Sequence, residues 1–543
     1  MISMAAAAVM LPACAEAVVD TPALNAYARA RLADGDKAVP VAVAGYAEAL
    51  AADPDNAVLA LRSYRQAMAA GNMALAVRAA QVMDSAGVLP RDGVLLLAVD
   101  ALGREEWARA RQLADRLRTE ESFAFLAPFL TSWVSLASGP YLTPAVDQTG
   151  QFAALTGRYL DEHIALQALA RKDIAAATPA IRRALSLRTS TQPGLRIAIA
   201  RRLAALGSRD EALAILDLDD PVLNAAKPQF GGRRFSKGPA LTPQRGFGRA
   251  LARLADDVGE GNSRPLALAL ARMASFSDPK SDEMRVAVAR QLVLSSLPDI
   301  ALAEAVKVTD KSPWVVAADD VQVVALARLG RSEDAMTLAR NAAARPGASA
   351  AQYLQLGNLL SEADQFGPAV DSYRQAQARY PKGAIPWSLY LLEGSALERA
   401  GRWDEAKVAL QNAAAIAPEE PVVLNYLGYA QVERRQNMTQ ALDLLRRAQA
   451  LRPDDAAIAD SLGWAHFVAG DSRKALPMLE KAAAGAPGDV TINEHLGDAL
   501  WAVGRRYEAR YAWTAARAFA EGEAAARIGG KISSGFKPEW AAH

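Results

Sequence analysis

Residues 426–455 read YLGYAQVERRQNMTQALDLLRRAQALRPDD, and residues 461–489 read SLGWAHFVAGDSRKALPMLEKAAAGAPGD. In both stretches a glycine is followed by an alanine, a large apolar residue, a second alanine and a proline, in that order. A further copy, HLGDALWAVGRRYEARYAWTAA, occupies residues 495–516. The glycines are spaced 34, 35 and 34 residues apart: Gly394, Gly428, Gly463 and Gly497. A fixed period of this length predicts a repeat architecture.

The order of these residues has a physical reason. Glycine and alanine carry no bulky side chain, so two helices can approach closely where these residues face each other. The large residue four positions after the alanine, such as Leu479 after Ala475, fills the gap to the next unit. Proline ends the second helix, and segments such as ERAGRWDEA at 398–406 place a glycine at the turn between helices. The pattern therefore predicts a series of helical hairpins.

This pattern resembles the tetratricopeptide repeat, and most closely the exported tetratricopeptide proteins of alphaproteobacteria. Weaker copies of it continue upstream, around Ala42, Ala177, Ala212, Ala301 and Ala335. The resemblance implies an all-α fold, a right-handed α-solenoid of about 13 stacked hairpins, some of them degenerate. In such a stack each unit is expected to touch only its neighbours.

Composition agrees with stacked helices. Apolar residues make up 51% of the 543 residues and charged residues 22%, which excludes wholesale disorder. The 61 basic residues against 60 acidic ones leave a net charge of +1, so no nucleic-acid partner is expected. One cysteine excludes an internal disulfide, and four histidines leave little material for a metal site. We expect neither a cofactor nor a bound metal.

The predicted organisation follows the quality of the repeats. It comprises a leader at 1–17, N-terminal repeats at 18–120, degenerate repeats at 121–345 with a basic loop at 224–245, well-formed repeats at 346–523, and a mobile tail at 524–543.

The leader is apolar from Ala5 to Leu11, as in a secretory signal, although a basic start is missing. The only cysteine, Cys14, directly follows Leu11-Pro12-Ala13, which resembles a bacterial lipobox. We therefore expect export to the periplasm, with Cys14 as a lipid anchor at the outer membrane and no other contact with a membrane. The alternatives are an ordinary signal cleaved near Ala15 or Ala17, and a cytosolic protein.

The resemblance implies that the first helix of each hairpin lines a concave groove. A stripe at spacings of three and four along these helices combines aromatic, amide and carboxylate side chains. Its members are Asn425, Tyr429, Asp460, Trp464, Phe467, Glu494, Asp498 and Trp501. Such a stripe suits a protein or peptide partner, or sugars stacking on Trp464 and Trp501. The alternative is that Trp464, Phe467 and Trp501 are buried between adjacent units.

A second candidate site is basic. No acidic residue occurs between Pro221 and Ala255, and the segment is rich in glycine and proline at its centre. We predict an exposed loop there, whose cations could dock an anionic envelope surface. These cations are Lys227, Arg233, Arg234, Lys237 and Arg245. Phe230 and Phe235 could add an apolar anchor; the alternative is a solvated insertion that only joins two stretches of repeats.

Sequence signatures of enzymes are missing. GGKISSG at 529–535 lacks the spacing of a phosphate-binding loop, and no Gly-x-Ser-x-Gly elbow occurs. The leading hypothesis is a non-enzymatic envelope scaffold that holds partner proteins or peptides in its groove. The alternatives are a component of polysaccharide export or cell-wall synthesis that contacts glycan, an accessory subunit with a hidden hydrolase activity, and a cytosolic interaction module.

Overall fold

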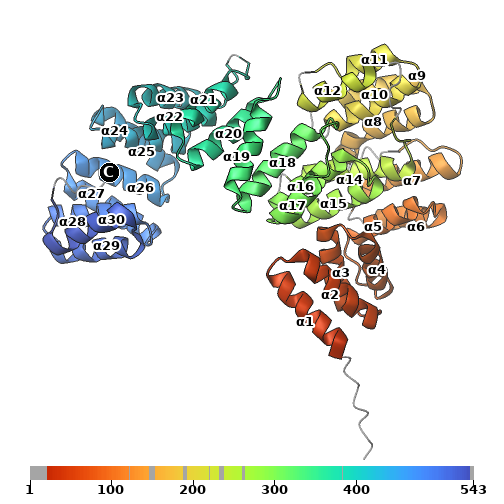
Figure 1. The fold of residues 1–543 in the computed structure, drawn as a ribbon, viewed down its shortest axis with the longest axis horizontal. Helices are drawn as coiled ribbons and strands as arrows, with labels where there is room; N and C mark the ends of the chain where they lie inside the picture. The colour runs from red at the N-terminus through yellow and green to blue at the C-terminus, as the bar shows by residue number, and fades with distance from the viewer. Residues whose placement is uncertain are drawn as a thin grey trace, which may run out of the picture. The chain divides into compact units, whose positions relative to one another are not determined.

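The computed structural model describes residues 21–120, 123–145, 153–186, 192–218, 220–231, 238–259, 263–381 and 383–537. Across these residues the chain is an all-α helical solenoid and contains no strand, which confirms the predicted fold class (Figure 1). The chain divides into two compact units, which we call unit 1 (Met1–Ala342) and unit 2 (Ala343–His543). The leader and Cys14 lie outside the described residues. Within those residues, no helix has both the length and the apolar character needed to span a bilayer.

Unit 1 consists of one 3-10 helix (Ala124–Leu126) and a series of α-helices. They are α1 (Thr21–Gly35), α2 (Val39–Ala52), α3 (Ala57–Ala70), α4 (Met73–Ser85), α5 (Gly93–Gly103), α6 (Trp107–Thr119), α7 (Ala127–Ser138), α8 (Ala153–Ala170), α9 (Ile174–Ser186), α10 (Gln192–Ala205), α11 (Arg209–Ile215), α12 (Pro221–Ala226), α13 (Pro228–Gly231), α14 (Pro243–Gly259), α15 (Arg264–Ser277), α16 (Asp282–Leu294), α17 (Pro298–Ala305), α18 (Val315–Arg328) and α19 (Ser332–Ala343).

The chain of unit 1 folds back on itself. Helices α14 and α15 pack together and also contact α3, α5 and α7. Arg272 on α15 donates a hydrogen bond to the carbonyl oxygen of Ala69 at 2.8 Å, across 203 residues of sequence. One apolar core accordingly includes residues from Val39 to Ala325. The expectation that each hairpin touches only its neighbours is therefore wrong for unit 1.

Unit 2 follows the predicted stack. Its helices are α20 (Ala350–Glu362), α21 (Phe366–Gln377), α22 (Trp387–Arg399), α23 (Trp403–Ile416), α24 (Pro421–Glu433), α25 (Met438–Leu451), α26 (Ala456–Val468), α27 (Ser472–Gly485), α28 (Val490–Ala502), α29 (Arg506–Phe519) and α30 (Gly522–Ser534). Each even-numbered helix from α20 to α28 packs against the helix that follows it, and each pair packs against the next. We call α20, α22, α24, α26 and α28 the first helices of their hairpins.

Large side chains pack directly against the repeated glycines of unit 2. A Cβ atom at Gly394 would lie 2.7 Å from Cδ2 of Leu410, and one at Gly497 would lie 2.3 Å from the ring of Trp513. Helix starts are fixed locally as well, since the side chain of Asp455 accepts hydrogen bonds from the first backbone N–H groups of α26. Close approach and capping together explain why the sequence period is so regular here.

The predicted mobile tail at 524–543 is wrong over most of its length. Residues 522–534 form helix α30, which packs against α29. Ile528 and Lys531 on this helix are fully buried. Residues 538–543 lie outside the described part of the chain. The helix forms because Ile528 and Lys531 find partners on the preceding hairpin, a contact that local composition does not reveal.

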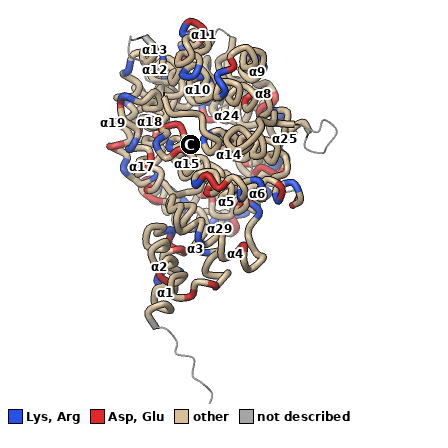
Figure 2. Tube along the Cα trace, turned by 90° about the vertical axis from the view of Figure 1, so that its right-hand side faces the viewer, with Lys and Arg blue, Asp and Glu red and all other residues tan. Residues whose placement is uncertain are grey.

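The basic loop predicted at 224–245 is also partly wrong. Most of residues 224–231 belong to α12 and α13, and α14 begins at Pro243. Phe230 is buried in the core, so it is no exposed anchor. Lys227 forms an ion pair with Asp217 at 3.1 Å. Arg233, Arg234, Lys237 and Phe235 lie outside the described residues. Figure 2 shows both signs of charge interspersed along the described helices.

Candidate functional site

The structure brings the predicted groove residues of unit 2 together. Asn425 and Tyr429 lie on α24, the next three residues on α26, and the last three on α28. These are successive first helices that contact one another. However, Asp460, Trp464, Glu494 and Asp498 are buried, while Asn425, Tyr429, Phe467 and Trp501 are half-buried. The predicted stripe therefore exists as a continuous feature, but half of it is internal.

The indole of Trp464 links neighbouring first helices. Its Nε1–H donates to Oε1 of Glu433 at 2.7 Å, and its ring stacks on the imidazole of His495 with centroids 3.9 Å apart. Trp464 is only 2% exposed. The alternative that this tryptophan is buried between adjacent hairpins is therefore confirmed. Burial, together with Glu433, raises the pKa of Tyr429 on the same surface.

The imidazole of His495 is fully buried and pairs with Asp460, with Nδ1 2.9 Å from Oδ2. Burial alone lowers the pKa of His495, but the negative charge of Asp460 and its hydrogen bond outweigh burial and raise that pKa above its usual value. Asp460 therefore acts as the internal partner of a histidine and is not open to a ligand.

Helix α30 covers the acidic residues of α28. Arg527 donates two hydrogen bonds to Glu494 at 2.9 and 2.8 Å. Nζ of Lys531 lies 2.7 Å from both Glu494 and Asp498. Burial raises the pKa of Asp498 to about 6, against the attraction of Lys531. Beyond the helix, Gly535 packs against the ring of Trp501, which stays half-buried.

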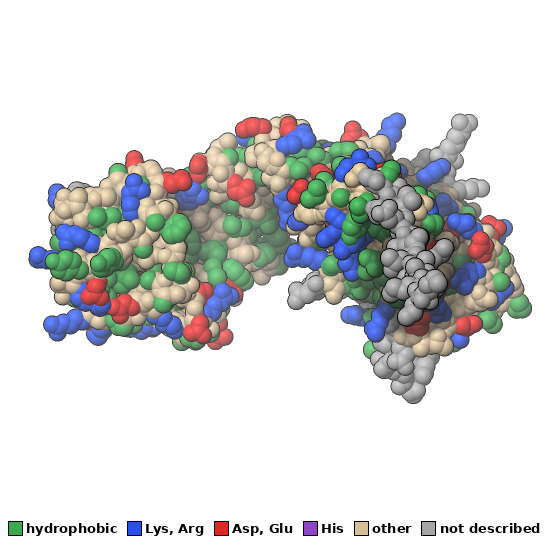
Figure 3. Space-filling model, turned by 90° about the horizontal axis from the view of Figure 1, so that it is seen from below, with side chains coloured by type: hydrophobic (Ala, Val, Ile, Leu, Met, Phe, Trp, Pro, Cys, Tyr) green, Lys and Arg blue, Asp and Glu red, His purple; other side chains and the backbone are tan. Residues whose placement is uncertain are grey.

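The open part of this surface lies on the preceding first helices. We define the first-helix face as the half-buried residues on α20, α22 and α24 at spacings of four: Leu354, Asn358, Leu391, Ser395, Asn425 and Tyr429. Side chains four apart on a helix point the same way. Oδ1 of Asn425 is buried without a hydrogen-bond partner among the described residues. Figure 3 shows hydrophobic side chains among charged ones on the surface of unit 2, at its left.

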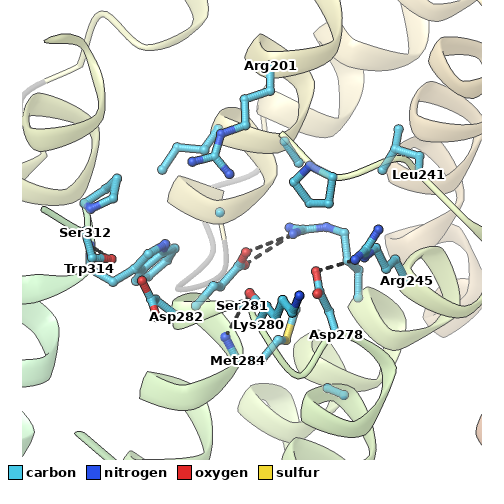
Figure 4. A pocket seen from close by; sticks show the side chains of 18 of the residues that line it. Arg201, Leu241, Arg245, Asp278, Lys280, Ser281, Asp282, Met284, Ser312 and Trp314 are labelled. Carbon is cyan, nitrogen blue, oxygen red and sulfur yellow. Dashed lines mark hydrogen bonds and ion pairs between the residues drawn. The ribbon is translucent and has the colours of Figure 1, made fainter. Parts of the chain in front are cut away.

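Unit 1 contains a cavity of about 370 Å³ that the sequence analysis missed (Figure 4). Its walls come from α10, from residues 239–249, from the start of α16 and from residues 312–314. Arg201 and Arg202 on α10 line it, together with Arg245, Lys280 and Trp314. In the sequence, only the adjacent arginines of α10 hint at an anion site. The other lining residues come from segments more than 100 residues apart, so no local pattern connects them with these arginines.

Arg245, predicted as a docking cation, lies in this cavity and not on an open loop. It forms an ion pair with Asp278 at 3.2 Å and donates to the carbonyl oxygen of Ala240 at 3.1 Å. Within the described residues, no cluster of three or more histidine, cysteine, aspartate or glutamate side chains could hold a metal ion.

Comparison with known proteins yields likenesses of fold. No protein-family model matches the chain, and no curated protein matches it. A MamA structure (MamA MSR-1 C2) is 21% identical with a TM-score of 0.26, covering 31% of this chain and 95% of its own. YrrB, described as a TPR protein with an unusual peptide-binding site, is 19% identical with a TM-score of 0.27, covering 31% and 86%.

The Cut9–Hcn1 hetero-tetramer of the APC/C is 13% identical with a TM-score of 0.40, covering 83% of this chain and 98% of its own. At these identities and scores the likeness concerns the fold alone. The chain's own period and the close packing against the glycines of unit 2 define it as a solenoid of helical hairpins that resembles the tetratricopeptide repeat.

Proposed function

We propose that the protein is a non-enzymatic scaffold that binds an extended segment of a partner protein along the first-helix face of unit 2. The observation that carries the proposal is Asn425. Its side chain lies half-buried on this face with a buried oxygen that has no hydrogen-bond partner among the described residues. An unpaired buried carbonyl oxygen costs free energy, and a rotation of the half-buried Asn425 side chain toward the face would let this oxygen accept a hydrogen bond from a backbone N–H of a bound segment.

The neighbouring side chains suit an extended peptide. Leu354, Leu391 and Tyr429 offer apolar contacts, and they alternate with polar groups along the successive helices. The carboxylates farther along the stack are already paired with His495, Arg527 and Lys531. The face is therefore expected to read apolar side chains and backbone hydrogen bonds of its partner, with little selection for basic residues.

Glycan stacking receives no support from this geometry. Trp464 is buried, and the half-buried ring of Trp501 contacts Gly535 and lies 5.3 and 5.1 Å from the guanidinium groups of Arg506 and Arg510. A sugar would have to displace these neighbours to stack on Trp501, so the glycan alternative is not proposed through these residues.

We also propose, from the sequence of residues 1–17 alone, that the scaffold is exported and anchored through Cys14. Mass spectrometry of the mature amino terminus from the native host tests this part. An acylated Cys14 supports it, whereas an amino terminus that still begins with Met1 in a cytosolic fraction contradicts it.

The binding site is tested with peptides selected from a displayed random library on the full-length protein. The selected peptides are expected to lose at least about tenfold in affinity in the double variant Asn425→Ala, Tyr429→Ala, because a buried hydrogen bond and an aromatic contact are lost. Asn412→Ala is the matched control, since Asn412 is an exposed asparagine on α23. Peptides that bind the double variant as tightly as the wild type would contradict the proposed site.

A further inference from the structure

The cavity of unit 1 carries more positive charge than its own carboxylates can balance. Its lining contains three carboxylates, and each has a cation beside it. Asp278 pairs with Arg245 at 3.2 Å, Glu283 with Arg249 at 3.1 Å, and Asp282 with Arg285, outside the lining, at 2.8 Å. The carboxylates are therefore already neutralised.

Three lining cations remain without an ion pair among the described residues: Arg201, Arg202 and Lys280. Arg201 has one hydrogen bond, from Nη2 to Oε1 of Gln229 at 3.3 Å. Residues 187–191 and 232–237, which adjoin the cavity walls in sequence, contain no aspartate or glutamate. Neither stretch can therefore supply the missing negative charge.

Two glycines leave room for the charged side chains at the cavity. Gly238 has φ +66°, and a Cβ atom there would lie 2.8 Å from Cδ of Arg201, so the aliphatic stem of Arg201 rests on this glycine. A Cβ atom at Gly194 would lie 1.8 Å from Oε1 of Glu283, so this glycine admits the partner of Arg249. Figure 4 shows Arg201 pointing from α10 toward the cavity, opposite Ser281 and Lys280.

Both unpaired arginines lie in an unfavourable environment. Each is only partly exposed. Burial lowers the pKa of Arg201, although nearby carboxylates oppose this effect. Burial also lowers the pKa of Arg202, and the positive charge of Arg245 lowers it further. Arg245 repels Arg202, and an anion bound beside Arg201 and Arg202 would offset both this repulsion and the cost of desolvating the two guanidinium groups.

Part of the remaining wall is apolar. Ile197, Leu241, Met284 and the indole of Trp314 line the cavity beside the arginines. We propose that the cavity binds a small organic oxyanion, a carboxylate or a phosphate, whose charged group is held by Arg201 and Arg202 and whose apolar body lies against Trp314. A volume of about 370 Å³ accommodates a molecule with one ring and its charged group. This site is separate from the first-helix face and goes beyond the proposed scaffold function.

Isothermal titration calorimetry of the full chain tests the site with phenyl phosphate, benzoate, inorganic phosphate and neutral benzyl alcohol. Phenyl phosphate or benzoate is expected to bind, and the stronger of the two identifies the charged group. Benzyl alcohol is expected not to bind. Arg201→Met and Arg202→Met are each expected to weaken binding by about 10- to 100-fold, because a charge-assisted hydrogen bond is lost. Trp314→Ala is expected to lower the affinity for phenyl phosphate more than the affinity for inorganic phosphate.

Arg290→Met is the matched control, since Arg290 is an exposed arginine on α16 outside the cavity. Circular dichroism checks that each variant folds. Hydrogen exchange of the wild type needs no variant, and slower exchange of residues 194–202 on adding the anion supports the assignment. The proposal is overturned if neither anion binds at millimolar concentration, if Arg290→Met weakens binding as much as Arg201→Met, or if inorganic phosphate binds as tightly as phenyl phosphate.

Discussion

Units 1 and 2 are both built from helical hairpins, but the contacts that stabilise these hairpins span different separations in sequence. In unit 2, side-chain bonds join first helices one hairpin apart, as between Arg434 and Glu398, 36 residues away. In unit 1, Arg253 bonds to the backbone of Arg158, 95 residues away, and Arg272 bonds to Ala69 across 203 residues. The first helices of unit 2 carry the half-buried first-helix face, whereas in unit 1 segments more than 100 residues apart line the arginine-rich cavity.

This difference leads to an expectation about cooperativity. A chain of nearest-neighbour contacts can open locally at one end while the rest stays folded. Buried ion pairs that join distant helices make these helices open together. A perturbation in unit 1 should therefore spread across distant segments, and a perturbation in unit 2 should stay within one or two hairpins.

The largest expected effect is that of Arg249→Met in unit 1. This arginine is buried and pairs with Glu283 at 3.1 Å and with Glu162 at 3.4 Å. Removing it leaves Glu283 without its cation, which is expected to lower the opening free energy of α8, α14 and α16 by about 3 kcal/mol. Native-state hydrogen exchange measures this effect. The exposed Arg290→Met on α16 should change the same amides by less than about 0.5 kcal/mol.

Lys531→Met in unit 2 is expected to lower the local opening free energy by a somewhat smaller amount. The lysine is fully buried between Glu494 and Asp498, but Arg527 remains beside Glu494 and the indole N–H of Trp513 still donates to Asp498. We expect α30 to open more readily by about 2 kcal/mol. Limited proteolysis within 522–537 reports this opening. The exposed Lys481→Met serves as the control, and equal protection of α30 in both variants would contradict the role of Lys531.

His163 in unit 1 and His495 in unit 2 should contribute to stability with opposite pH dependence. Burial, assisted by Arg249 and Arg253, lowers the pKa of His163 in unit 1 to about 3, whereas Asp460 raises the pKa of His495 in unit 2. The stabilisation from His163 is present above the unfolded pKa of about 6.5 and is lost as pH falls toward about 3. That from His495 is present below about 6.5 and is lost as pH rises through its folded pKa.

Each effect amounts to at most about 1.4 kcal/mol per pH unit within its window. The chain has four histidines, so NMR of ¹³C-labelled histidine can follow each ring separately. His163 is expected to stay neutral at pH 5, while His495 is expected to titrate above 6.5, and Asp460→Asn should lower its pKa. A His495 that titrates below 6.5 in the wild type would contradict the pairing.

The smallest effect compares two glycines of unit 2. Gly394→Ala places a Cβ atom 2.7 Å from Leu410, and we expect a loss of about 1 kcal/mol because the side chain must shift. Gly367 in α21 has no atom within 4 Å of such a Cβ, so Gly367→Ala is expected to stabilise by about 0.5 kcal/mol. Denaturant unfolding of both variants measures the difference. Equal changes in the free energy of unfolding would show that the packing of Leu410 does not require a glycine at position 394.

The sequence predicted the parts of the molecule that depend on local spacing. The hairpins of unit 2 follow from the repeated glycines, because each glycine must admit the large residue of its own hairpin. The predicted stripe lies on α24, α26 and α28. The pairing of Glu494 and Asp498 was not predictable, since Arg527 and Lys531 lie on α30, beyond the last repeat. Composition alone suggested a mobile tail there.

The cavity of unit 1 could not be predicted for a related reason. Arg201, Asp278 and Trp314 line the cavity from three separate segments of the chain, and no sequence period records such a placement. The basic character of residues 221–255 was visible, but two of its arginines, Arg249 and Arg253, are buried against Glu162. Their partner lies about 90 residues upstream, as the separation of 91 residues between Arg253 and Glu162 shows.

Hydrogen exchange of the full chain, read by mass spectrometry for Arg249→Met and Lys531→Met side by side, tests the contrast between the units most directly. The account predicts faster exchange in α8, α14 and α16 for the first variant, and only in α28, α29 and α30 for the second. A response to Arg249→Met confined to α14 and α15, or a response to Lys531→Met that reaches α20, would contradict it.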